Sequence, residues 1–80
     1  MKVDYMPLPM IVPGREYIID HIATGKTAVN NLRGYGILPG IKIKLLFSSP
    51  FRDPSAYEVM GAVLALRHED SKSIFVRLPE

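Results

Sequence analysis

The chain has 80 residues, of which 48% are hydrophobic and 22% charged, and its formal net charge is +2. A chain of this length makes one small domain, residues 1–80, which buries only about 60% of the surface exposed when unfolded and so leaves little room for a deep catalytic cleft. The absence of cysteine rules out a disulfide framework and thiolate metal sites. The ten basic residues are spread along the chain, whereas nucleic-acid binders usually concentrate them on one face.

The first ten residues predict neither a signal peptide nor a membrane span. Asp4, Pro7 and Pro9 interrupt the apolar run that either segment requires. Together with the lack of cysteine, this favours a reducing, cytoplasmic location.

The first predicted strand covers residues 15–23 and follows a Pro-Gly turn pair. Alternation places Tyr17, Ile19 and His21 on one face. Because its neighbours on that face are apolar, we interpret His21 as a half-buried structural residue and not as a metal ligand.

The apolar residues after this strand have the spacing of a helix. Val29, Leu32 and Tyr35 are spaced three apart, which places them on one stripe. Thr27 is the predicted N-cap. Gly36 is predicted to end the helix in the left-handed conformation.

Two glycine-containing stretches raise the question of a phosphate-binding loop. In "GYGILPG" the helix precedes the strand, so no helix N-terminus follows to receive a phosphate. In "TGKTAV" a helix does follow, but the Walker spacing places Asp20 where the first glycine belongs, and a carboxylate there repels phosphate. We interpret both stretches as turns at the ends of the helix.

The clearest strand signal lies in residues 41–48, where lysines alternate with apolar residues. The side chains predicted to face the core are Ile41, Ile43, Leu45 and Phe47. Residues 48–55 predict a loop or turn bounded by Pro50 and Pro54, neither of which can donate to a sheet.

The remaining residues predict short elements. Residues 56–60 and 62–67 are two strands or one bent strand, with Gly61 as a bulge or tight turn. Residues 68–73 predict one exposed helical turn, and residues 74–78 predict a closing strand. Five short strands with tight connections predict a mainly β domain, a small and partly open barrel.

No arrangement of residues indicates catalysis. The serines lack the strand-to-helix elbow of a nucleophile, and nothing around Asp53 and Glu58 indicates shifted pKa values. The run His68, Glu69, Asp70 offers ligands for a divalent ion such as Fe²⁺, but adjacent side chains rarely converge on one ion. We therefore predict no enzyme activity, no cofactor and no metal ligand, and interpret the run as a solvated turn.

The loop tip Phe51, Arg52 and Asp53 is the strongest candidate for partner binding. An apolar side chain between prolines and charged neighbours is poorly placed for the core, and such residues anchor partners at interfaces. The alternative, that Phe51 folds back over the mouth of the barrel, remains open.

An ordered series of motifs spans residues 8–76. It consists of "LPMIVPG", the helix end with "YGILPG", the loop "SPFRDP" and the closing stretch "GAVLALRHED" followed by "IFV". This series resembles the FeoA family, small cytosolic proteins encoded with the bacterial ferrous-iron transporter FeoB. The sequence departs from the family at Phe51 and Arg52, where leucine and glycine are usual, and at Ser71, where alanine is usual.

The resemblance implies an SH3-like barrel, so we expect a five- to six-stranded, partly open barrel with one or two short helices. It also implies a non-enzymatic cytoplasmic accessory protein that binds the cytosolic domain of FeoB. The same barrel forms the C-terminal domain of DtxR-like metal-dependent repressors, so a stand-alone regulator domain is one alternative. The basic pI leaves nucleic-acid binding as another, and direct Fe²⁺ binding and self-association also stay open.

Overall fold

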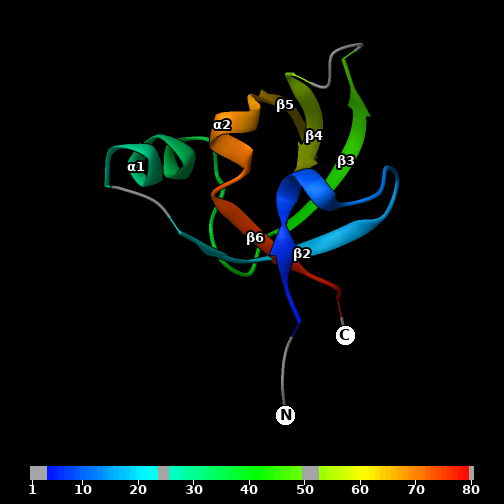
Figure 1. Cartoon of the computed structure of the whole chain (residues 1–80), viewed down its shortest axis with the longest axis horizontal. Helices are drawn as coiled ribbons and strands as arrows, with labels where there is room; N and C mark the ends of the chain where they lie inside the picture. Colours follow the sequence, from blue (N-terminus) through cyan, green and yellow to red (C-terminus); the bar gives the residue numbers. More distant parts are fainter. Residues whose placement is uncertain (1–3, 24–25, 50–52, 80) are drawn as a thin grey trace.

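The computed structural model describes residues 4–23, 26–49 and 53–79. In this part of the chain, six strands form one antiparallel sheet in the order β1-β6-β2-β3-β4-β5. The strands are β1 (Met6–Pro7), β2 (Glu16–Ile22), β3 (Lys42–Ser48), β4 (Ser55–Val59), β5 (Ala62–Leu66) and β6 (Ile74–Arg77). The helices are the 3-10 helix η1 (Leu8–Met10) and the α-helices α1 (Lys26–Gly34) and α2 (His68–Ser71). The expected mainly β, six-stranded, open fold is confirmed, with α1 and the end of β3 at opposite ends of the molecule (Figure 1).

The core lies on the inner face of the curved sheet. Alternate residues of the central strands β2, β3 and β6 point into it, and η1 and α1 each add a leucine. Apolar burial of this kind is the main favourable term in folding. The core side chains with no more than 1% of their surface exposed are Leu8, Ile19, Ile37, Ile43, Ile74 and Val76.

The end of α1 is a Schellman motif. Gly36 has a φ of +86°, in the left-handed region. The Ile37 N–H donates to the Leu32 carbonyl (3.0 Å), and the Gly36 N–H donates to the Arg33 carbonyl (2.9 Å). Leu32 and Ile37 are both buried, so the motif closes over an apolar contact. The predicted helix end is confirmed.

Other details of the predicted helix are wrong. The helix begins at Lys26, so Thr27 is its second residue and not its N-cap. Tyr35 is 61% exposed, because the helix ends at Gly34 and its period no longer applies to the next residue. The side chain of Val29 lies outside the described part of the chain.

A bulge at Asp20 reverses the faces of β2. Ile19 pairs with Val76 and His21 pairs with Phe75, so one extra residue stands between them on β2. His21 therefore leaves the core face that it was predicted to share with Ile19. Ile22, placed by strict alternation on the other face, packs against the core instead.

A second bulge changes the end of β3. Leu45 pairs with Tyr57 while Phe47 pairs with Ala56, so Leu46 is the extra residue. The prediction that Phe47 faces the core is wrong, since 63% of its surface is exposed. Ile43 and Leu45, which precede the bulge, are buried as expected.

Strands β4 and β5 form a tight hairpin. Met60 and Gly61 connect them with φ values of +52° and +80°, as in a type I′ turn. Of the two arrangements left open by the sequence, two strands with a tight turn at Gly61 is the correct one.

Candidate partner-binding site

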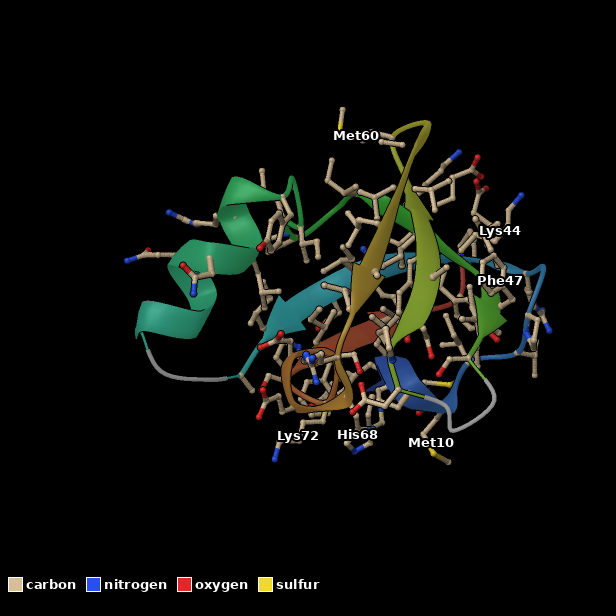
Figure 2. All side chains as sticks on the ribbon, turned by 90° about the horizontal axis from the view of Figure 1, so that it is seen from above. Met10, Lys44, Phe47, Met60, His68 and Lys72 are labelled. Atoms are coloured by element: carbon tan, nitrogen blue, oxygen red, sulfur yellow. The ribbon has the colours of Figure 1, made fainter. Side chains whose placement is uncertain are left out.

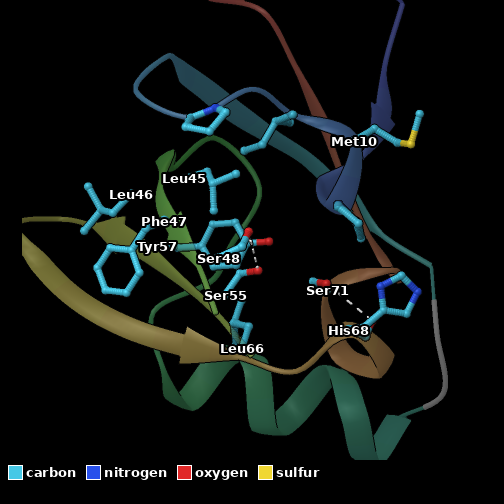
Figure 3. Close-up of a pocket in the computed structure, with 13 residues that line it drawn as sticks. Met10, Leu45, Leu46, Phe47, Ser48, Ser55, Tyr57, Leu66, His68 and Ser71 are labelled. Carbon is cyan, nitrogen blue, oxygen red and sulfur yellow. Dashed lines mark hydrogen bonds between the residues drawn. The ribbon is translucent and has the colours of Figure 1, made fainter. Parts of the chain in front are cut away.

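An open pocket of about 760 Å³ lies where η1, α2 and the ends of β3, β4 and β5 meet (Figure 3). Side chains from each of these elements line the pocket, because the loops that join the elements lie at the same end of the sheet. The residues that matter most for its chemistry are Met10, Phe47, Ser55, Tyr57, His68 and Ser71.

The rim of the pocket carries two exposed apolar side chains. Met10 is 69% and Phe47 63% exposed, and they lie on different sides of the pocket in Figure 3. Below the rim, Leu45 and Leu66 are buried and line the apolar wall. An apolar concavity with exposed apolar side chains at its rim is typical of a protein-binding site.

The polar residues that line the pocket are four with hydroxyl groups and one with an imidazole: Ser48, Ser55, Tyr57, Ser71 and His68. The Ser55 hydroxyl donates to the Ser48 hydroxyl at 3.1 Å. Burial raises the pKa of the Tyr57 hydroxyl, an effect that the hydroxyls of Ser71 and Ser55 partly offset. Tyr57 therefore stays protonated at neutral pH, so the hydroxyls of the pocket supply hydrogen bonds and no charge.

Ser71 is the buried polar side chain of the described core, with 2% of its surface exposed. Its hydroxyl donates to the His68 carbonyl at 3.3 Å, within the single turn of α2. This bond satisfies the buried hydroxyl.

Asp53 is the predicted contact residue that the structure describes, and its carboxylate is already engaged. Its Oδ1 accepts a hydrogen bond from the backbone N–H of His68 at 3.0 Å. Its own N–H donates to the Ser49 hydroxyl at 2.9 Å. Because His68 is the first residue of α2, this carboxylate ties the loop to the start of the helix. Phe51 and Arg52 lie outside the described residues, so their predicted contact role stays a prediction.

The sequence did not single out Met10 or Phe47. Met10 lies in the apolar run "MPLPMIV", which gives no sign of which side chain is exposed. Phe47 fits the alternation of its strand, and only the bulge at Leu46 turns it outward.

A polar and aromatic cluster lies on the outer face of β2 and β6. Asp20 accepts a hydrogen bond from Arg77 Nε (3.2 Å) and pairs with His21 Nδ1 (2.6 Å). His21 stacks on Phe75 with ring centroids 4.8 Å apart, and Tyr5 meets the His21 ring edge-on. The hydrogen bond with His21 and, less strongly, Arg77 lower the pKa of Asp20 against a partial opposing effect of burial. His21 is half-buried, as predicted, but it lies on the outer face and not on the face of Ile19.

The run His68, Glu69, Asp70 forms the single turn of α2. Within the described ranges, no group of three or more His, Cys, Asp or Glu side chains is placed to hold a metal ion. Nor does any helix in these ranges combine the length and apolar character needed to cross a membrane.

An open, strongly curved antiparallel sheet with short helices in its connections defines a small domain of the SH3-like class. The sequence model of the FeoA domain matches residues 6–78, and the chain therefore belongs to the FeoA family. The resemblance that the ordered motifs indicated is confirmed. A search of curated proteins found no match.

Solved structures agree with this assignment. The chain is similar to an iron uptake regulatory protein (FeoA), with 28% identity over 94% of this chain and 97% of the other and a TM-score of 0.83. It is also similar to iron(II) transport protein A from Clostridium thermocellum, with 26% identity over 91% of this chain and 45% of the other and a TM-score of 0.87. A manganese-dependent transcriptional repressor has the same fold over 44% of its length, with 14% identity over 99% of this chain and a TM-score of 0.88.

Proposed function

We propose that the chain is a non-enzymatic accessory protein of ferrous iron uptake that acts in the cytoplasm by binding the cytosolic domain of FeoB. Membership of the FeoA family supports the link to iron transport. A similar solved structure carries the name iron uptake regulatory protein. The largely apolar lining of the pocket supports action by binding, because it offers a partner apolar surface to cover.

The single observation that carries the proposal is the pair of exposed apolar side chains, Met10 and Phe47, on the rim of the pocket. Exposed side chains of this size gain free energy when a partner covers them, about 25 cal/mol for each Å² of apolar surface removed from water. Large side chains next to a concavity are also where interfaces concentrate their binding energy. We therefore place the FeoB contact on the pocket and its rim.

Calorimetry with the purified cytosolic domain of FeoB tests the proposal. We expect the wild-type chain to bind, and Phe47→Ser and Met10→Ser each to weaken binding at least tenfold. Tyr35→Ser is the matched control, since Tyr35 is exposed to a similar degree but lies beyond the end of α1. Equal affinities for Phe47→Ser, Tyr35→Ser and the wild type would remove the pocket from the interface, and no binding by the wild type would remove FeoB as the partner.

The predicted loop contacts enter the same experiment. Phe51→Ala and Arg52→Ala should weaken binding if the loop tip contacts FeoB. Asp53→Ala should act indirectly, because the Asp53 carboxylate holds the start of α2. Unchanged affinity for Phe51→Ala would confine the interface to the pocket.

Direct metal binding is not part of the proposed function. We expect anaerobic calorimetry with Fe²⁺ to show no heat of binding in the micromolar range. A stoichiometric heat signal would contradict this expectation and show that the protein binds Fe²⁺ directly.

A second candidate function is that of a domain of a metal-dependent regulator. It is favoured by the fold shared with the manganese-dependent repressor. The 28% identity to the iron uptake regulatory protein places the transport role first. Binding to a DtxR-like repressor but not to FeoB would reverse this order.

A further inference from the structure

Strand β5 is an edge of the sheet and lacks the usual protection of an edge. It pairs with β4 alone among the described strands, and Figure 2 shows it beside β4. Natural edge strands usually carry a charged residue, a proline or a bulge that prevents further pairing. The sequence of β5, "AVLAL", contains neither charge nor proline, and its register with β4 has no bulge.

The register shows which backbone groups of β5 are free to pair. The two-residue turn makes Val59 and Ala62 a hydrogen-bonded pair. Hydrogen-bonded and non-hydrogen-bonded pairs alternate along an antiparallel ladder. The N–H and C=O groups of Val63 and Ala65 therefore point away from β4, toward the open side of the sheet.

The side chains next to this free edge are apolar and exposed. Val63 is 63% exposed, and Ala65 is exposed as well. The pairing register places Ala65, Ala56 and Phe47 in one row across β5, β4 and β3. A strand added to β5 extends this apolar row by one side chain, which adds apolar burial to the backbone hydrogen bonds.

Arg67 supplies a positive charge where β5 ends. Its carbonyl accepts hydrogen bonds from the N–H groups of Asp70 and Ser71, both at 3.0 Å, which fixes the backbone at this point. Its side chain is exposed and forms no ion pair with any residue that the structure describes. The charge that complements this end of the edge is a carboxylate.

We propose that β5 binds an extended segment of a partner protein, which pairs antiparallel with β5 as an additional strand. Backbone hydrogen bonds to Val63 and Ala65 supply affinity, and the segment carries small apolar residues opposite them and an acidic residue opposite Arg67. This is the known mode of β-strand addition to an open sheet edge. The surface shares Phe47 with the rim of the pocket, but the backbone groups of Val63 and Ala65 are not part of the pocket, and the proposal does not depend on FeoB being the partner.

A second copy of the chain fits this edge less well. The strand of a second copy, "AVLAL", contains no carboxylate for Arg67. Charge therefore favours a peptide segment over a second copy.

NMR titration of the ¹⁵N-labelled chain with the peptide acetyl-Glu-Thr-Val-Thr-Val-Thr-amide tests the proposal. We expect the amide signals of Val63 and Ala65 to shift in a saturable manner below millimolar peptide. Ala65→Pro removes the outward N–H and should weaken binding at least tenfold, while Ala65→Ser keeps this N–H and should bind as the wild type does. Proline is tolerated where an edge N–H faces solvent, and an unchanged thermal unfolding curve confirms that each variant folds.

The acidic preference has its own control. A peptide with lysine in place of glutamate should bind the wild type several-fold more weakly than the glutamate peptide does. The same lysine peptide should bind Arg67→Glu more tightly than it binds the wild type. No shift at Val63 and Ala65, or equal affinity of Ala65→Pro and Ala65→Ser, would overturn the proposal. The proposal would also be overturned if, without peptide, the same amides became more protected from hydrogen exchange as the protein concentration rises. That result would identify a second copy as the occupant.

Discussion

The centre of the sheet and its β4–β5 hairpin use similar side chains in opposite ways. In β2 and β6, Ile19, Ile74 and Val76 have no exposed surface. In the hairpin, Met60 is 76% and Val63 63% exposed, and Figure 2 shows Met60 at the tip, away from the body of the domain. The contrast is between the buried residues of the central strands and the exposed residues of the hairpin, because the hairpin also contributes to the core Tyr57, Val59 and Leu66.

The difference separates residues that hold the fold from residues available to a partner. A domain of this size has a stability on the order of 5 kcal/mol, so the central strands have little stability to lose. Exposed side chains of the hairpin and of the pocket rim contribute little to folding and gain free energy only when they are covered. Binding residues can therefore be sought where truncation leaves stability unchanged.

The largest expected effect on stability is at a residue in the centre of the sheet. Ile19→Ala should lower the free energy of unfolding by about 2–5 kcal/mol, because it removes buried methyl groups and leaves a cavity. Val63→Ala in the hairpin should change it by less than about 0.5 kcal/mol. Urea denaturation of both variants measures the contrast, and similar losses in the two variants would contradict the division into two regions.

The next effect concerns the end of α1. Gly36→Val should cost about 1–2 kcal/mol, because a side chain disfavours the left-handed conformation. A steric clash with neighbouring residues does not cause this loss of stability, since a Cβ at Gly36 meets nothing within 4 Å.

Gly34→Ala is the control for this prediction. It lies inside α1, also with open space around it, and should stabilise the protein by up to about 1 kcal/mol. Thermal unfolding of the pair distinguishes the two glycines, and equal changes of the same sign would refute the Schellman assignment.

A smaller effect is expected at the base of the loop. Asp53→Ala should lower stability by about 1 kcal/mol, because the His68 N–H loses its acceptor at the start of α2. Asp53→Asn should recover most of this loss, since an amide oxygen accepts the same bond. If the asparagine variant is as unstable as the alanine variant, the carboxylate acts by its charge and not as a cap.

The smallest effect is a pH dependence from Asp20. The pKa of this carboxyl is lowered from 3.8 in the folded chain, first by its hydrogen bond with His21. A lowered folded-state pKa stabilises the protein above the unfolded-state pKa, and this stabilisation is lost as the pH falls through the folded-state pKa. Asp20→Asn should remove this acid-dependent loss below about pH 4. Urea midpoints between pH 2 and pH 6 measure it, and identical pH profiles for both proteins would show that Asp20 is not coupled to folding.

Local patterns predicted most of the fold. Strands β2 to β6, the single turn of α2 and the end of α1 each follow from residues that are close in sequence, such as Gly36 at the helix end, whereas β1 was not predicted. The two bulges did not follow, because an extra residue at Asp20 or Leu46 is defined only by the register with a partner strand. Each bulge reverses the faces beyond it, and this is why His21 and Phe47 were placed on the wrong side.

The candidate site was harder to predict than the fold. Asp53 was identified as a loop residue, but its bond to His68 joins residues that are 15 apart in sequence. Met10 and Phe47 line one pocket only because η1 and the end of β3 border it from different sides. No pattern within either segment indicates that the two side chains share one pocket.

The most direct test of the account is an NMR titration of the ¹⁵N-labelled chain with the cytosolic domain of FeoB. We predict that the largest changes in the amide signals occur at residues of the pocket, Met10, Phe47 and Ser55 among them, and leave Tyr35 unchanged. Changes centred on α1 and absent from the pocket, or no changes at all, would contradict the proposed interface.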